Sequence, residues 1–256
     1  MMKKFKRIYV EITNACNLNC HFCDKTIRLK RHMTSSEYRL VIDKIAPFTD
    51  YVYLHVKGEP LLHNELEEIL EISKGKVLVN ITTNGTLIDK RIDVLRKYKA
   101  VINRVNISVH SNFQDEGYLE KILDFCRIVN EEELFDVVIR FWIKKSVNVV
   151  NRFIETKFVH LSFDEEFSWP NLNKPFVSEV GKCLGTKTHL AVLSNLDVVP
   201  CCLDHDGIMV LGNLFNENLS DIINKPLFQN IKQGFSNRKI VMDLCKHCSY
   251  RRRFDG

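Results

Sequence analysis

The chain has 256 residues, of which 45% are hydrophobic, and its formal net charge is +5. That length allows one large domain, or one domain with a small appendage. Both charge signs are spread along the chain, so an anionic ligand is compatible with the charge, but charge alone does not support nucleic-acid binding. No segment has the apolar run of a signal peptide or a membrane span, so we expect a cytoplasmic protein without a membrane partner.

Short β-rich runs alternate with helical patterns through the first two thirds of the chain. A helix is expected at 35–45, opened by a capping box of Thr34 and Glu37. A second helix is expected at 65–73, with Asn64 as its N-cap. The strands are expected at 7–13, 51–56, 77–82, 104–109, 137–143 and 158–163.

This alternation implies parallel strands joined by right-handed crossovers, in an open sheet or a barrel. In the second strand Val52 and Leu54 share one face, while Tyr53 and His55 share the other. Later strands repeat this division into an apolar and a polar face. A filled barrel interior is mostly Val, Ile and Leu, so the polar face indicates a cavity for a polar ligand. The alternative is a solvent-facing sheet, although parallel sheets are normally covered on both faces.

The pattern changes after residue 163, where the loop-like stretch "DEEFSWPNLNKP" begins. From about residue 180 onward the chain carries five of its nine cysteines. We therefore expect a second, small module that does not rely on an apolar core alone. The predicted modules are residues 1–165 and 166–256.

The stretch "TNACNLNCHFCDK" holds Cys16, Cys20 and Cys23 in the spacing C-x3-C-x2-C. In a reducing compartment, such cysteines indicate metal binding or catalysis and not disulfides. A structural zinc site needs four closed ligands, and no second cysteine pair lies nearby. A [4Fe-4S] cluster has four irons, so three thiolates would leave one iron open for a substrate or cofactor. A zinc site stays open as the alternative.

Polar motifs follow the expected strands at the point where each strand ends. "KGEP" (57–60) follows the second strand, "TTNG" (82–85) ends the third, and Ser108 lies near the end of the fourth. The carboxyl ends of parallel strands form the edge where ligands bind in α/β folds. Each short motif alone is a common turn sequence, but together they predict one site.

The cysteine motif, with Phe22 before its last cysteine and a repeated βα pattern around it, resembles the radical S-adenosylmethionine (radical SAM) superfamily. The resemblance covers about residues 5–165 and implies an α/β fold, a partial (β/α)6 TIM-like barrel. It implies that Cys16, Cys20 and Cys23 hold a [4Fe-4S] cluster. The fourth iron would then bind the amino and carboxylate groups of S-adenosylmethionine.

"KGEP" resembles the Gly-Gly-Glu-Pro turn of this superfamily, with Lys57 in place of the first glycine. In that turn, Gly58 leaves room for the methionine moiety and Glu59 accepts from its ammonium group. Polar residues of the fourth and fifth strands contact the ribose or the carboxylate. The resemblance therefore implies cofactor contacts by Phe22, Gly58, Glu59, Asn84, Ser108 and Arg140.

The tail resembles the shortened SPASM module called twitch, which binds one auxiliary [4Fe-4S] cluster. The resemblance lies in a β-hairpin around "DVVPC", then "GNL", a helical "L-x-x-I" and a closing C-x2-C. It implies a small β-hairpin plus helix module. Four thiolates would also suit zinc on spacing alone. The implied cluster ligands are Cys183, Cys201, Cys245 and Cys248, with Cys202 as the alternative to Cys201.

The resemblance implies that one electron enters the first cluster, the cofactor is cleaved, and a 5'-deoxyadenosyl radical abstracts hydrogen from a substrate. A fully ligated second cluster would accept an electron, which favours dehydrogenation of a small polar or sugar-like molecule. A peptide-modifying enzyme is the alternative, and a zinc-binding module without activity a remote one. An external one-electron donor such as flavodoxin or ferredoxin is implied. The catalytic candidates are Glu59 and the possible bases His160, Asp164, Glu165 and Glu166.

Overall fold

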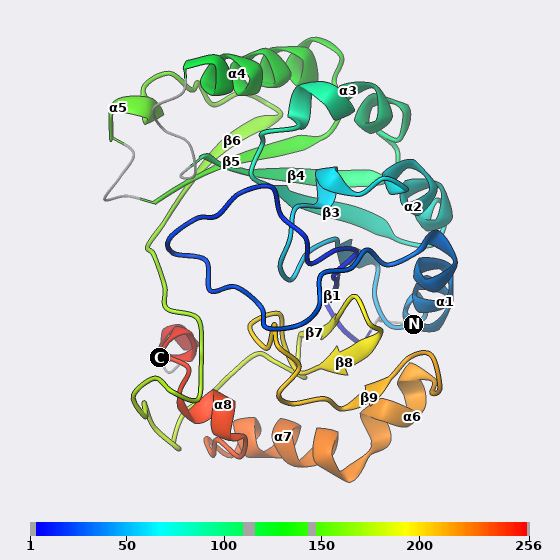
Figure 1. Ribbon diagram of the computed structural model, residues 1–256, viewed down its shortest axis with the longest axis vertical. Helices are drawn as coiled ribbons and strands as arrows, with labels where there is room; N and C mark the ends of the chain where they lie inside the picture. Colours follow the sequence, from blue (N-terminus) through cyan, green and yellow to red (C-terminus); the bar gives the residue numbers. More distant parts are fainter. Residues whose placement is uncertain (1–3, 110–115, 143–146, 255–256) are drawn as a thin grey trace.

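The computed structural model describes residues 4–109, 116–142 and 147–254. Within these ranges the strands form one mixed sheet in the order β6-β5-β4-β3-β2-β1-β7-β8-β9 (Figure 1). Neighbours from β6 to β7 are parallel, while β8 and β9 run antiparallel to their neighbours. The strands are β1 Arg7–Val10, β2 Tyr51–Tyr53, β3 Leu78–Thr83, β4 Ile102–Ser108, β5 Asp136–Trp142, β6 Val159–Asp164, β7 His189–Val192, β8 Asp197–Val199 and β9 Gly212–Asn213.

Helices cover the outer side of the curved sheet, and the loop after β1 lies on its inner side (Figure 1). Among the described residues no helix is long and apolar enough to cross a membrane. The helices are α1 Ser35–Ile45, α2 Leu66–Ser73, α3 Ile88–Lys97, α4 Glu116–Glu131, α5 Val147–Val150, α6 Leu219–Asn224, α7 Pro226–Ser236 and α8 Asp243–Lys246, with 3-10 turns at Pro60–Leu62 and Tyr250–Phe254.

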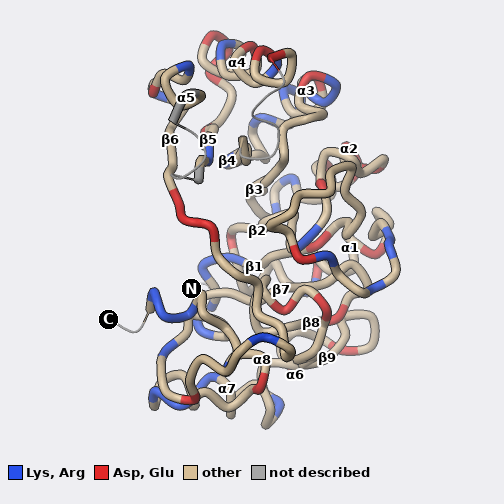
Figure 2. The backbone as a smooth tube through the Cα atoms, turned by 60° about the vertical axis from the view of Figure 1, so that its left-hand side comes forward, with Lys and Arg blue, Asp and Glu red and all other residues tan. Residues whose placement is uncertain are grey.

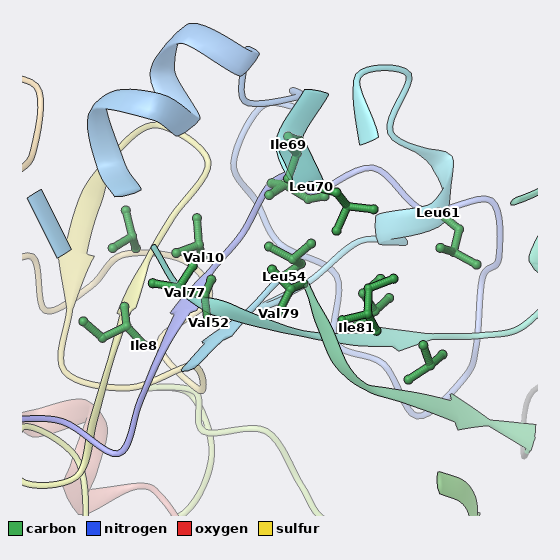
Figure 3. Close-up of a cluster of buried hydrophobic side chains, with 14 of the residues drawn as sticks. Ile8, Val10, Val52, Leu54, Leu61, Ile69, Leu70, Val77, Val79 and Ile81 are labelled. Carbon is green, nitrogen blue, oxygen red and sulfur yellow. The ribbon is translucent and has the colours of Figure 1, made fainter. Parts of the chain in front are cut away.

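The apolar face expected from the alternation packs against these helices. Val52 and Leu54 are fully buried beneath Ile69 and Leu70 of α2, as Figure 3 shows. Burying one such side chain contributes about 1.5–3 kcal/mol. The opposite face is thereby left to polar and aromatic side chains, which is the face that the site uses.

The helix α1 has the expected bounds, and Thr34 and Glu37 form its capping box. The expectation that Asn64 caps α2 is wrong, because Glu65 is the N-cap and makes no side-chain cap bond. The Glu65 carboxylate instead accepts from the backbone N–H of Ser35 at 2.6 Å, which ties the start of α2 to that of α1.

Two strands are shorter than expected. The strand β1 ends at Val10 and not at residue 13, because the chain there enters the cysteine loop. The strand β2 ends at Tyr53 and not at residue 56, because the "KGEP" turn follows. Residue 143, the expected end of the fifth strand, lies outside the described residues.

The tail continues the sheet of the first two thirds. The β7–β8 hairpin around "DVVPC" is present as expected, but β7 pairs in parallel with β1 along its whole length, from Arg7 opposite His189 to Val10 opposite Val192. The division into 1–165 and 166–256 stays a prediction. What the pairing adds is that the tail cysteines approach the cysteine loop.

Candidate active site

One cavity of about 920 Å³ opens on the inner side of the sheet. It is lined by the loop after β1, by the ends of β2 to β6 and by the tail. The structure thus brings both cysteine groups to the same space. The expected site residues that line it are Cys16, Cys20, Phe22, Cys23, Gly58, Glu59, Asn84, Ser108, Arg140, Asp164, Cys183, Cys201, Cys245 and Cys248.

The first three cysteines lie on a loop, residues 14–31, whose two ends are bonded together. Asn14 donates to the carbonyl of Leu29 at 2.9 Å and accepts from the N–H of Arg31 at 2.7 Å. Burial raises the pKa of the Cys16 thiol, and the negative charges of Glu59 and the two other cysteines add to this. Thiolates gathered in this way need a cationic partner, which a metal cluster supplies.

The tail thiols form a second group. Burial raises the pKa of Cys201 well above its usual value, and nearby Cys202, Cys183 and Cys245 raise it further. Cys202 also makes a side-chain hydrogen bond with Tyr9, and burial raises its pKa to about 11. The arrangement therefore favours Cys201 over Cys202 as the fourth thiol of the group.

The number and type of these donors fit two [4Fe-4S] clusters. In such a cluster each ligated iron binds one cysteine thiolate, so the thiolates lie farther apart than the ligands of a single metal ion. Within residues 4–109, 116–142 and 147–254, no three or more His, Cys, Asp or Glu side chains are spaced to hold a single metal ion.

The "KGEP" turn places a buried carboxylate beside the first cysteine group. Glu59 accepts from the Thr83 hydroxyl at 2.6 Å, the Asn84 N–H at 2.8 Å and the Leu61 N–H at 3.0 Å. Burial raises the pKa of Glu59, while these hydrogen bonds act in the opposite direction. The neighbouring Gly58 has φ +77°, a left-handed conformation that favours glycine.

Polar side chains at the ends of β4 to β6 form the opposite wall. Ser108 lies directly beside Arg140 in the sheet register. The Arg140 guanidinium lies 3.8 Å from the Asp164 carboxylate, and Arg253 of the tail lies 3.8 Å from its other oxygen. Ser108, Arg140 and Asp164 thus lie side by side at one edge of the sheet, where the sequence predicted polar groups.

Three of the expected bases do not reach this cavity. His160 lies in the first half of β6, where its ring is 3.9 Å from Asp136. Glu165 and Glu166 belong to the acidic segment directly after β6 (Figure 2), and neither lines the cavity. The alternation predicts which face a side chain lies on, but not how far along the strand the cavity reaches.

Sequence reasoning did not identify Glu11, which is fully buried. Its carboxylate accepts from the Arg28 guanidinium at 2.7 and 2.8 Å, from the Lys57 N–H at 3.1 Å and from the Ser194 N–H at 3.0 Å. These bonds join β1, the cysteine loop, the "KGEP" turn and the tail. The signal that could have identified it is a single charged residue within the expected strand sequence "YVEIT".

His55 has a more direct place in the cavity than the sequence indicated. It lines the wall, and its Nδ1 is buried without a hydrogen-bond partner in the part of the chain that the structure describes. Burial, followed by the charges of Arg140 and Arg7, lowers the pKa of His55 to about 3. The ring is therefore neutral, and its Nδ1 is an unsatisfied buried polar atom in the cavity wall.

Two domain families match the chain. Residues 10–149, more than half of the sequence, match the radical SAM superfamily. The chain belongs to the radical SAM superfamily. Residues 183–249 match SPASM, an iron-sulfur cluster-binding domain. Both matches confirm the family and module expected from the motifs, together with S-adenosylmethionine and two [4Fe-4S] clusters as the cofactors of a radical SAM enzyme.

Curated relatives of this radical SAM chain have more than one activity. It is 24% identical to a probable GTP 3',8-cyclase of Methanocaldococcus jannaschii, covering 99% of this chain and 84% of that protein. It is 23% identical to the S-adenosyl-L-methionine-dependent 2-deoxy-scyllo-inosamine dehydrogenase of Niallia circulans, covering 97% and 94%. It spans only 45% of the Aquifex aeolicus GTP 3',8-cyclase, at 32% identity.

Solved structures agree with the α/β fold and its mostly parallel, curved sheet. The structure of BtrN with AdoMet and 2-DOIA has a TM-score of 0.67 at 20% identity, covering 97% of this chain and 94% of that one. The structure of anSMEcpe with AdoMet and the Cp18Cys peptide has a TM-score of 0.65 at 17% identity, covering 98% and 88%. At such identities the likeness shows the fold.

Proposed function

We propose that this radical SAM enzyme dehydrogenates a small polar or sugar-like molecule, with a tail cluster as the electron acceptor. The observation that carries the proposal is that two separate thiol groups line one cavity, together with the polar side chains Ser108, Arg140 and Asp164. A substrate in that cavity lies within reach of both groups. The similarity to the Niallia circulans dehydrogenase over 94% of that protein's length supports the same reaction class.

In this proposal Cys16, Cys20 and Cys23 hold the first cluster and leave one iron for the cofactor. Bound there, the cluster and S-adenosylmethionine would supply the radical chemistry that removes a hydrogen atom from the substrate. An external one-electron carrier, such as flavodoxin or ferredoxin, is the proposed donor. The loop containing these cysteines is closed by its own hydrogen bonds, so the thiols are positioned before the cofactor arrives.

The cofactor contacts follow from free hydrogen-bonding capacity. An ionised carboxylate has about four acceptor positions. Glu59 Oε1 accepts two hydrogen bonds, from Thr83 and Leu61, whereas Oε2 accepts one, from Asn84. The remaining position on Oε2 suits the cofactor's ammonium group, and Arg140 with Ser108 suits its carboxylate or ribose.

Asp164 is the proposed proton acceptor, because it alone of the expected bases other than Glu59 lines the cavity. Asp164→Asn should lower product formation about 10²–10⁴-fold, while substrate-dependent release of 5'-deoxyadenosine continues. The neighbouring Glu165→Gln, which changes the same charge outside the cavity, should leave both unchanged. Equal losses in the two variants would remove Asp164 from this role.

The cluster count tests the basis of the proposal. Anaerobically reconstituted protein should bind about eight irons per chain, four for each cluster. Cys201→Ser should lose about four irons. Cys202→Ser should keep all of them, since the Cys202 side chain is hydrogen-bonded to Tyr9. Fewer than about seven irons in the unmodified protein, or uptake of zinc without colour, would contradict the proposal.

The substrate is tested by product analysis. We expect 2-deoxy-scyllo-inosamine or a related polyol to increase 5'-deoxyadenosine release and to yield one ketone for each 5'-deoxyadenosine formed. Mass spectrometry of the reaction mixture measures both products. If peptides and no polyols increase the release, the chain is a peptide-modifying enzyme.

A further inference from the structure

Lys57 stands where the Gly-Gly-Glu-Pro turn of the superfamily has its first glycine, and only 6% of it is exposed. Its Nζ lies 3.6 Å from the Sγ of Cys23, at hydrogen-bond distance for sulfur. A lysine at this depth has little access to water. Its side chain therefore depends on protein partners, and the proposed ligand sulfur is the one to which it donates a hydrogen bond.

The Trp169 ring is a second partner of the Lys57 ammonium group. Lys57 Nζ lies over the indole, 3.3 Å from its centre. The indole packs edge-on against the His205 ring, at 5.2 Å between ring centres. The Trp169 carbonyl accepts from Lys174 at 2.7 Å, and Lys174 also donates to Asp24 at 2.9 Å. The tail and its linker thus restrain the lysine.

Nearby carboxylates already have partners of their own. Asp24 accepts from Lys174, and Asp206 accepts from the Thr26 hydroxyl at 2.7 Å and from the Ile27 N–H at 3.0 Å. Lys57 makes its side-chain hydrogen bond to sulfur. Its position is therefore not explained by a simple ion pair.

We propose that Lys57 is a positioning residue that raises the reduction potential of the first cluster by donating to the Cys23 sulfur. The inference rests on the proposed function, because it takes Cys23 as a cluster ligand. Reduction adds one electron from the external carrier and no proton or new bond at Lys57. The added negative charge is stabilised by a buried N–H donor and cation, since hydrogen bonds to sulfur and burial set cluster potentials.

The test is an anaerobic redox titration of reconstituted protein without substrate, followed by electron paramagnetic resonance. The signal that changes when S-adenosylmethionine is added reports the first cluster. In Lys57→Met, the ratio of reduced to oxidised first cluster at a fixed solution potential should fall about tenfold, a shift of ~59 mV for one electron. Lys57→Gln, which keeps an N–H donor without the charge, should shift less.

Lys30→Met is the matched control, because it removes the same charge from an exposed position of the cysteine loop. Solvent screens that charge, so the potential should not change. Trp169→Ala keeps the lysine but removes its restraint, and should shift the potential in the same direction by a smaller amount. If Lys57→Met loses four irons and cannot be titrated, the potential measured in Trp169→Ala tests the inference instead.

An unchanged potential in Lys57→Met with all iron retained would overturn the inference, as would a shift of the same size in Lys30→Met. If Lys57→Met loses iron and Trp169→Ala has an unchanged potential, Lys57 only supports the loop and the inference fails. Failure of the proposed function looks different, since the unmodified protein would then bind too little iron or would not cleave the cofactor.

Discussion

Gly58→Ala is expected to lower the free energy of unfolding by more than about 4 kcal/mol and to prevent retention of the first cluster. Its φ is +77°, and an added Cβ would lie 2.3 Å from the carbonyl oxygen of Thr13 and 2.9 Å from that of Ala15. Both are backbone atoms at the start of the cysteine loop. They cannot move aside without opening the loop, because the N–H of Glu59 bonds to the same Ala15 carbonyl at 2.9 Å.

Gly75→Ala is the matched control for this change. Gly75 has φ +71°, but an added Cβ there meets nothing within 4 Å. It should cost only the backbone strain, about 1–2 kcal/mol. Denaturant unfolding under anaerobic conditions measures both variants, and iron analysis measures the cluster. If the two alanines cost the same, contact with the loop does not explain the glycine at position 58.

Glu11→Gln is the second change with a large expected effect. The carboxylate is fully buried and is the partner of Arg28, whose side chain is 13% exposed. Removing one member of a buried pair leaves the other charge uncompensated and costs about 3–5 kcal/mol. For a chain of this size the melting temperature should fall by about 10 °C. Thermal unfolding followed by circular dichroism measures this change in melting temperature.

Two further variants separate this explanation from a general loss of charge. Asp43→Asn breaks a surface pair with Lys76 and should cost less than about 1 kcal/mol. The double variant Glu11→Gln, Arg28→Met should recover part of the loss, because the unpaired cation is then absent. A Glu11→Gln protein within 1 kcal/mol of the unmodified chain would show that the pair does not hold the loop.

These contacts have a consequence for the proposed transfer of an electron from the substrate to the tail cluster. Glu11 binds the cysteine loop through Arg28 and the tail through the N–H of Ser194. Lys57 of the "KGEP" turn makes a second connection, because it contacts both Cys23 of the loop and Trp169. The loop and the tail are thus held at a defined separation, as the proposed role of the tail cluster as electron acceptor would require.

Local signals in the sequence predicted local structure well. The capping box at Thr34 and Glu37 stands next to the helix that it opens, and α1 has the expected bounds. The alternation of Val52 and Leu54 with Tyr53 and His55 depends only on the two-residue period of a strand. The start of α2 was predicted wrongly, because the Glu65 carboxylate accepts a hydrogen bond from Ser35, 30 positions away, and local signals do not show such a contact.

Features that depend on distant segments could not be derived from the pattern. Nothing in residues 189–192 indicates that β7 pairs with β1, and this pairing brings the tail thiols into the cavity. The same applies to the bases. His160 and Asp164 share a strand and a face, yet only Asp164 lies at the end that the cavity reaches.

The sequence by itself determined the βα order, the apolar face and the three-cysteine motif, because period and spacing are properties of neighbouring residues. The tertiary structure decided that the tail thiols and the cysteine loop line one cavity, and that Lys57 contacts both Cys23 and Trp169. These contacts depend on residues far apart in the chain, such as Lys57 and Trp169, meeting in one buried space, where burial and hydrogen bonding select a single arrangement.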